Sequence, residues 1–172
     1  IRLPRMSNFT DFNVFELIPC VSLRYVRSPA QLGNPDLIII PGTKNTMSDL
    51  LWLRQNGLEA EIKKCAAGET VIFGICGGYQ MLGRSLEDPY GVEQGGMLPG
   101  MGLLDIATIF APQKTRTQVS GRFNTLNGPL AELSGLSFQG YEIHMGISQV
   151  ADTQALAVLN SIAGDSKPDG CT

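Results

Sequence analysis

Short apolar runs bounded by turn residues recur through the first half of the chain. They lie at 1–5, 21–26, 37–42 and 70–76. Continuous apolar runs of this length are typical of strands that are buried on both faces of a parallel sheet. The pattern therefore predicts four buried strands.

Segments with helical spacing lie between these runs. Thr46 stands three residues before Asp49, as in a capping box, and apolar residues follow at helical spacing. A second apolar stripe runs over 58–66 and stops before Gly68, where a left-handed cap would fit. The alternation of strand and helix predicts an α/β fold, a flavodoxin-like three-layer αβα arrangement with a mainly parallel sheet.

The pattern changes in the second half. Residues 89–102 hold five glycines and two prolines, which predicts a surface loop over a site. Beyond it, β-branched and aromatic residues at 103–110, 115–123 and 137–146 predict strands, and their short separations favour antiparallel pairing. We expect one domain over 1–172, with an antiparallel extension of the parallel sheet.

Composition and charge exclude several classes of function. The 172 residues carry 13 Lys and Arg against 16 Asp and Glu, with no basic cluster, so we do not expect nucleic acid as a partner. No purely apolar run, the one at 37–40 included, approaches the length of a membrane span, and we expect a cytoplasmic protein with no membrane partner. Widely spaced cysteines and a single histidine, His144, argue against a metal site.

The strongest chemical signal lies at the end of the fourth apolar run. Residues 71–75 lead directly into Cys76, which glycines precede and follow, and a helix-forming stretch comes next. This is the layout of a nucleophile elbow with cysteine in the place of serine. It predicts a nucleophilic Cys76 whose pKa is lowered by the helix dipole, with the backbone N–H of Gly77 facing an oxyanion. The alternative is a small buried cysteine in a tight turn.

A second turn follows the third apolar run. The carboxyl ends of parallel strands share one edge of a sheet, so Gly42 and Thr43 could direct another backbone N–H toward Cys76. An ordinary turn between strand and helix is the alternative. His144 is a candidate base because a thiolate nucleophile needs one and the chain has no other histidine, although a histidine in a strand is more often structural.

These motifs resemble those of a known family. The segment GICGGYQMLG at 74–83 is similar to the nucleophile motif of class I glutamine amidotransferases. Together with LPRMSNFTDF at 3–12, PGTKNTMSDLLWLR at 41–54 and GYEIHMG at 140–146, it resembles the C-terminal glutaminase domain of cobyric acid synthases. The similarity extends over nearly the whole chain.

The resemblance implies a reaction and a set of roles. Cys76 would attack the side-chain amide of glutamine and release ammonia, with Gly42, Thr43 and Gly77 forming the oxyanion hole. Tyr79, Gln80 and His144 would lie in the substrate site. No cofactor is expected in this domain. ATP and Mg²⁺ would act in an N-terminal synthetase domain, absent from this chain, which uses the ammonia to amidate carboxylates of a corrin substrate.

One departure from the family concerns the base. The family pattern leads us to expect a later H-G-L-F-type segment, and none occurs before Thr172. We therefore expect the domain to be truncated at its C-terminus and weakly active by itself, with the base either His144 or a histidine beyond Thr172. Two other hypotheses stay open. One is the glutaminase subunit of another amidotransferase, such as lipid II isoglutaminyl synthase, against which PGTKNT argues. The other is a non-catalytic, flavodoxin-like regulatory domain.

Overall fold

A computed structural model describes residues 1–150, 154–161 and 164–172. Its strands are β1 (Leu37–Ile40), β2 (Val71–Gly74), β3 (Ser85–Asp88), β4 (Gly96–Pro99), β5 (Ile106–Phe123), β6 (Ser137–Val150), β7 (Ala157–Ser161) and β8 (Ser166–Asp169). Its helices are α1 (Asn13–Glu16), α2 (Pro29–Leu32), α3 (Thr46–Gln55), α4 (Leu58–Ala66) and α5 (Gly77–Met81), with 3-10 turns η1 (Phe9–Phe12) and η2 (Gly128–Leu133). The α/β class is confirmed.

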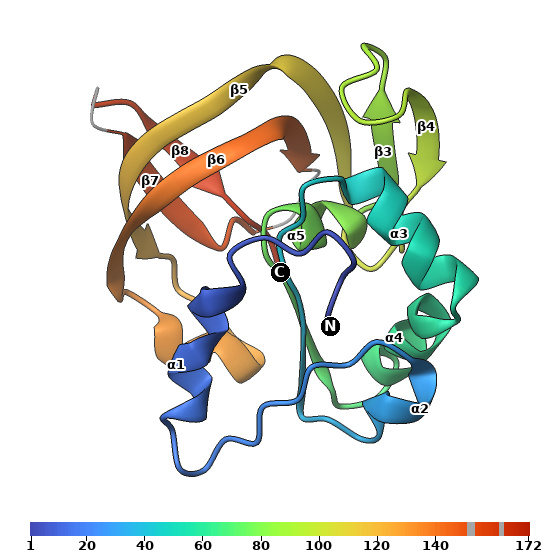
Figure 1. Cartoon of the computed structure of the whole chain (residues 1–172). Helices are drawn as coiled ribbons and strands as arrows, with labels where there is room; N and C mark the ends of the chain where they lie inside the picture. Colours follow the sequence, from blue (N-terminus) through green and yellow to red (C-terminus); the bar gives the residue numbers. More distant parts are fainter. Residues whose placement is uncertain (151–153, 162–163) are drawn as a thin grey trace.

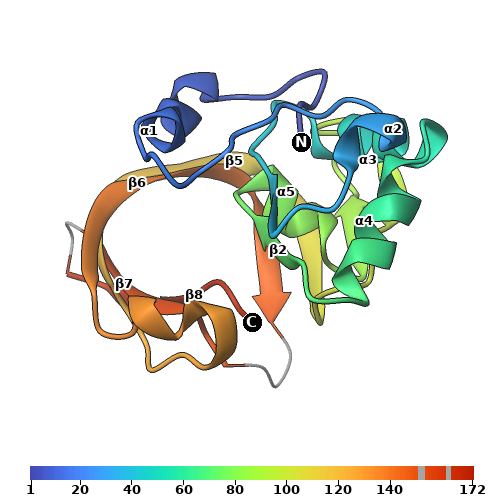
Figure 2. The same ribbon diagram turned by 90° about the horizontal axis from the view of Figure 1, so that it is seen from below.

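The strands form two sheets. β1 and β2 are parallel, with Ile40 opposite Gly74 at their carboxyl ends. The larger sheet has the order β4-β3-β5-β7-β8, with β6 paired to β5, and all its pairs are antiparallel except β3 with β5. In Figures 1 and 2, α2, α3 and α4 lie on one side of the molecule, and β5 to β8 curve together on the other. α5 lies between these two groups.

The helices around β1 form the core. Ile40, Leu50, Leu53, Leu58 and Ile62 have no exposed surface. They come from β1, α3 and α4, so the helical stripes predicted after Thr46 and over 58–66 do face the core. The packed layer fixes the turn between β1 and α3, which contributes to the candidate site.

Two of the predicted strands are wrong. Residues 1–5 and 21–26 form no strand, although Arg2 N–H donates to the carbonyl of Val26 at 2.8 Å. Leu3 and Val26 are both buried in the core. These residues are therefore apolar because they are buried in the core, not because they belong to a sheet.

The second half also departs from the prediction in detail. The glycine-rich segment at 89–102 contains β4, which pairs with β3. The strands predicted at 103–110 and 115–123 form one continuous strand, β5, with a register shift between Phe110 and Thr115. Among the described residues no helix is long and apolar enough to cross a membrane.

Candidate active site

Cys76 occupies a strained turn between β2 and α5. Its backbone has φ 51° and ψ −113°, and a positive φ is unfavourable for a residue with a Cβ. Such a conformation costs about 1–3 kcal/mol and persists only where the surrounding structure enforces it. The turn agrees with the nucleophile elbow predicted from the sequence.

Glycines on both sides of Cys76 allow α5 to pack directly onto the parallel strands. A Cβ on Gly78 would lie 1.9 Å from the carbonyl oxygen of Ile40, and one on Gly74 would lie 2.5 Å from Cα of Tyr79. The N–H of Ile75 donates to the same Ile40 carbonyl at 2.9 Å. The carboxyl end of β1 therefore packs directly against the elbow, and no larger residue fits at Gly78.

The thiol of Cys76 lies at the contact between the two sheets. Cys76 is exposed, and its Sγ lies 3.8 Å from the carbonyl oxygen of Ile143 on β6. Partial burial raises the pKa of the thiol, the N–H of Gly77 opposes this effect, and the charge of Glu93 adds to it. The expectation of a lowered pKa is wrong, because desolvation outweighs the favourable backbone contact at the start of a five-residue helix.

The turn after β1 reaches the nucleophile, as its position at the sheet edge suggested. A Cβ on Gly42 would lie 3.5 Å from Cβ of Cys76, and one on Gly77 would lie 2.9 Å from Cγ2 of Thr43. The N–H groups of Gly42 and Thr43 donate to no other described residue. The three residues named as oxyanion candidates, Gly42, Thr43 and Gly77, are thus brought together from two segments of the chain, and their role in binding an oxyanion stays a prediction.

The two residues after the glycines are turned into the protein. Gln80 is buried, with its amide oxygen 3.4 Å from the hydroxyl of Thr46, and a Cβ on Gly146 would lie 2.4 Å from its amide nitrogen. The hydroxyl of Tyr79 donates to the sulfur of Cys171 at 3.5 Å, and burial together with this contact raises its pKa. Both side chains support the elbow, and contact with a substrate stays a prediction for each.

His144 lies next to Ile143 on β6, the strand that touches the thiol. Its Nε2 is 2.6 Å from a carboxylate oxygen of Glu142, which also accepts from Lys167 at 2.5 Å. Burial tends to raise the pKa of Glu142, but the hydrogen bonds from Lys167 and His144 outweigh this and lower it. The imidazole is therefore oriented by a carboxylate, an arrangement compatible with either a base or a substrate contact.

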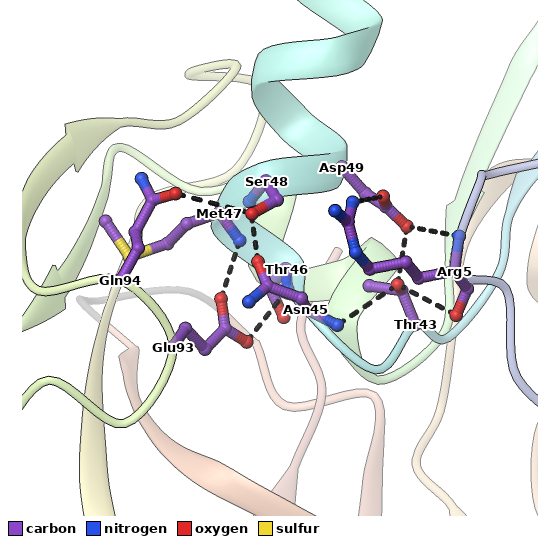
Figure 3. Close-up of polar contacts among 9 residues, drawn as sticks. All are labelled: Arg5, Thr43, Asn45, Thr46, Met47, Ser48, Asp49, Glu93 and Gln94. Atoms are coloured by element: carbon purple, nitrogen blue, oxygen red, sulfur yellow. Dashed lines mark hydrogen bonds and ion pairs between the residues drawn. The ribbon is translucent and has the colours of Figure 1, made fainter.

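A buried carboxylate holds the N-terminal segment against the site. Its spacing from Thr46 resembles a capping box, and the sequence therefore gave no sign of this role. Asp49 is fully buried and accepts hydrogen bonds from Thr43 Oγ1 at 2.6 Å and from Arg5, through Nη1 at 2.9 Å and the backbone N–H at 3.1 Å (Figure 3). The capping box predicted for Thr46 and Asp49 is wrong, since Asn45 is the N-cap and accepts from the N–H of Ser48 at 2.8 Å.

Glu93 is a second residue that sequence reasoning missed. Its carboxylate accepts from the N–H of Thr46 at 2.8 Å and of Met47 at 2.7 Å, at the start of α3 (Figure 3). Glu93 itself is held by Asp88, whose buried carboxylate accepts from the N–H groups of Val92, Glu93, Gln94 and Gly95. These four bonds outweigh burial and lower the pKa of Asp88. The loop after β3 is thereby fixed against α3 beside the elbow.

The geometry around Cys76 is compatible with nucleophilic chemistry by its thiol. Within residues 1–150, 154–161 and 164–172, no three His, Cys, Asp or Glu side chains are grouped so that they could hold a metal ion. The arrangement offers an exposed cysteine, N–H groups of Gly42 and Thr43 that donate to no described residue, and a histidine on β6, whose Ile143 carbonyl faces the sulfur. A thiol beside backbone donors is suited to attack on a carbonyl carbon.

Comparison with known sequences gives one consistent result. A family model described as the CobB/CobQ-like glutamine amidotransferase domain matches residues 1–172. A cobyric acid synthase from Ruminiclostridium cellulolyticum is 57% identical over 99% of this chain, and one from Lachnoclostridium phytofermentans is 58% identical over 86%. The chain spans 34% and 29% of the lengths of these two relatives.

Solved structures support the fold. A crystal structure of a glutamine amidotransferase matches with a TM-score of 0.63 and 18% identity, covering 90% of this chain and 80% of that one. The structure of PurLQS from Thermotoga maritima matches with a TM-score of 0.65 and 20% identity, covering 98% of this chain and 74% of that one. At these identities the similarity concerns the fold alone.

Proposed function

Because the chain belongs to the CobB/CobQ-like glutamine amidotransferase domain family, we propose that it hydrolyses glutamine at Cys76 and supplies ammonia for an amidation in cobyric acid synthesis. The observation that carries this proposal is the elbow itself. Cys76 is an exposed residue held at positive φ, and the turn at Gly42 lies beside it. The names of the relatives favour cobyric acid synthesis over lipid II amidation.

The residues suggest the following steps. The Cys76 thiolate attacks the amide carbon of glutamine, and the negative charge that develops on the amide oxygen is stabilised by backbone N–H groups of Gly42, Thr43 and Gly77. The amide nitrogen takes a proton and leaves as ammonia, so that a γ-glutamyl thioester remains. Water then attacks the thioester and releases glutamate. The proton of the thiol goes to a base, either His144 or a histidine outside this chain.

The partner follows from the length of the relatives. Since the chain corresponds to about a third of them, the remaining part is proposed to be the synthetase domain that binds ATP, Mg²⁺ and the corrin substrate. Ammonia would pass from this domain to an activated corrin carboxylate there. We propose no cofactor for the glutaminase domain.

Selective labelling of the thiol tests the nucleophile. A chloroketone analogue of glutamine should alkylate Cys76 at least about 10-fold faster than Cys20, which is also exposed but lies outside the site. Iodoacetamide, which lacks the glutamine skeleton, should show no such preference for Cys76, whose pKa is raised by burial. Peptide mass spectrometry measures both rates. Equal labelling of the two cysteines by the chloroketone would contradict the proposal.

A further inference from the structure

The segment at 13–21 exposes a group of aliphatic side chains. Its four large exposed aliphatic residues are Val14, Leu17, Ile18 and Val21, here called the α1 surface. Leu17 alone is 81% exposed, and Glu16 is the one charged residue in this stretch of the sequence. Single exposed apolar residues are ordinary, whereas a group of four within eight positions is typical of a surface that another polypeptide covers.

The segment is fixed at its base and leaves the α1 surface uncovered. Phe12 is buried, and the ring of Phe9 stacks on that of Tyr25 with the centroids 4.7 Å apart. In Figures 1 and 2, α1 lies on the opposite side of the molecule from α2, α3 and α4, outside the curved strands β5 and β6. The anchored segment therefore presents the α1 surface to solvent in a defined position, which lowers the entropic cost of binding a partner.

A short path joins the α1 surface to the nucleophile. The N–H of Ser7 donates to the carbonyl of Gly42 at 2.9 Å, and a Cβ on Gly42 would lie 3.5 Å from Cβ of Cys76. Asn8 then takes φ 52° and ψ 45°, a left-handed conformation that asparagine adopts more readily than most residues, and the chain turns into η1 and α1. The chain thus leads from the edge of the thiol site directly to the α1 surface.

The length of the relatives indicates what covers this surface. The chain spans 34% and 29% of two cobyric acid synthases, so about two thirds of each polypeptide lies outside the matched region. Ammonia released at Cys76 escapes into water unless the domain that uses it covers the exposed surface beside the thiol. An apolar surface suits a permanent contact of this kind, because obligate interfaces are more hydrophobic than transient ones.

We propose that the α1 surface is the docking site for the synthetase part of the same polypeptide, with Leu17 as its main contact. The inference rests on the proposed function, since that function requires a domain that consumes ammonia. The N–H of Leu17 donates to the carbonyl of Val14 at 3.2 Å, so the two side chains lie on one side of a helical turn and enter one apolar recess of the partner. Docking there places the synthetase part beside the turn at Gly42 and the thiol of Cys76.

Site-specific cross-linking tests the contact in a full-length polypeptide, in which this chain replaces the matching third of the Ruminiclostridium cellulolyticum relative. The photo-cross-linker p-benzoylphenylalanine is placed at position 17 or, as the matched control, at position 97, where Met97 on β4 is 69% exposed. Peptide mass spectrometry should find cross-links from position 17 to the other two thirds of the polypeptide at a yield at least about 10-fold above that from position 97. Equal yields from the two positions, or cross-links from position 17 to residues 1–172 of a second copy, would overturn the inference.

A second variant tests whether the contact is apolar. With the cross-linker at position 14, Leu17→Asp should lower the yield by at least about 10-fold, because an unpaired carboxylate is costly to bury in an apolar interface. Met97→Asp should leave the yield unchanged, and an unchanged yield in Leu17→Asp would also overturn the inference. Failure of the glutaminase proposal is a separate result, since the chloroketone analogue of glutamine would then show no preference for Cys76, whatever position 17 contacts.

Discussion

The hydroxyl of Thr43 donates a 2.6 Å hydrogen bond to the buried carboxylate of Asp49. The same carboxylate binds Arg5, so one side chain joins the N-terminal segment, the turn after β1 and the first turn of α3. A Cβ on Gly77 would lie 2.9 Å from Cγ2 of Thr43, so the turn and the elbow are close together. The position of the turn beside Cys76 therefore depends on Asp49, although Asp49 takes no part in the proposed chemistry.

Replacing Asp49 with asparagine should destabilise the fold. The substitution removes the charge that binds Arg5. It also puts an amide NH₂ group, which donates, where a carboxylate oxygen accepts hydrogen bonds from Arg5 and Thr43. Loss of hydrogen bonds to a buried charged group costs about 1–3 kcal/mol. Urea unfolding of Asp49→Asn measures the change in the free energy of unfolding, with Asp11→Asn, at an exposed position, as the control. An unchanged midpoint for Asp49→Asn would contradict this assignment.

The packing of α5 on β1 predicts a strong effect at Gly78. In Gly78→Ala the new methyl group would meet the Ile40 carbonyl at 1.9 Å, so the helix must move. We expect a loss of about 3 kcal/mol or more, at the upper end of the cost of overpacking. Gly140→Ala is the matched control because nothing lies within 4 Å of a Cβ there, and it should change the stability by less than about 0.5 kcal/mol. Similar unfolding curves for both variants would disprove the close approach.

Glu142 should make the stability depend on pH in the acidic range. Its pKa in the folded state is lowered from 4.5, because the bonds from Lys167 and His144 outweigh burial. The stabilisation is therefore complete above about pH 4.5 and is lost as the pH falls through the lower pKa of the folded state. Unfolding of the chain and of Glu142→Gln between pH 7 and pH 3 measures this. The difference in stability between the two proteins should shrink on acidification, and a constant difference would contradict the lowered pKa.

The backbone amides of the loop after β3 should lose protection from hydrogen exchange when Asp88 is replaced. Asp88→Asn removes the carboxylate that accepts from four successive backbone N–H groups, so the loop opens more often. Hydrogen exchange at the amides of Val92, Glu93 and Gly95 should accelerate by about 10- to 100-fold, in line with the loss of bonds to a charged acceptor. Glu87→Gln, one residue earlier, should leave these rates unchanged. Unaltered exchange in Asp88→Asn would show that the loop is held by other contacts.

The pH profile of alkylation tests the electrostatics of the nucleophile. Burial, aided by the charge of Glu93, raises the pKa of Cys76 above the ordinary value of 9.0. The rate of its reaction with iodoacetamide should therefore reach half of its maximum above pH 9.0 in the absence of glutamine. A half-maximal rate well below pH 9 would show that the backbone N–H of Gly77 outweighs burial.

Local patterns predicted the elements that carry the nucleophile. β1 and β2 are continuous apolar runs, and the glycines around Cys76 predicted the elbow because only they permit the close approach of α5. The same rule failed for residues 1–5 and 21–26, where Leu3 and Val26 are apolar because they are buried. Apolarity indicates that a segment is buried, but not whether its backbone joins a sheet.

Contacts between distant segments escaped prediction. The bond between Glu93 and Thr46 spans 47 residues, and that between Arg5 and Asp49 spans 44. Asp49 also lay at the right distance from Thr46 for a capping box, a local pattern that its buried contact with Arg5 overrides. The thiol pKa was misjudged for a similar reason, since the surroundings that desolvate Cys76 include Ile143 on a strand distant in sequence.

The contact between Cys76 and Ile143 makes the sulfur sensitive to movement between the two sheets. The cysteine backbone is fixed to β1 and β2, whereas the carbonyl that faces its thiol belongs to β6 of the larger sheet. A small displacement of β6 would thus change the hydration of the sulfur without altering the elbow. The reaction rate of this one thiol should therefore change when the two halves of the domain move relative to each other.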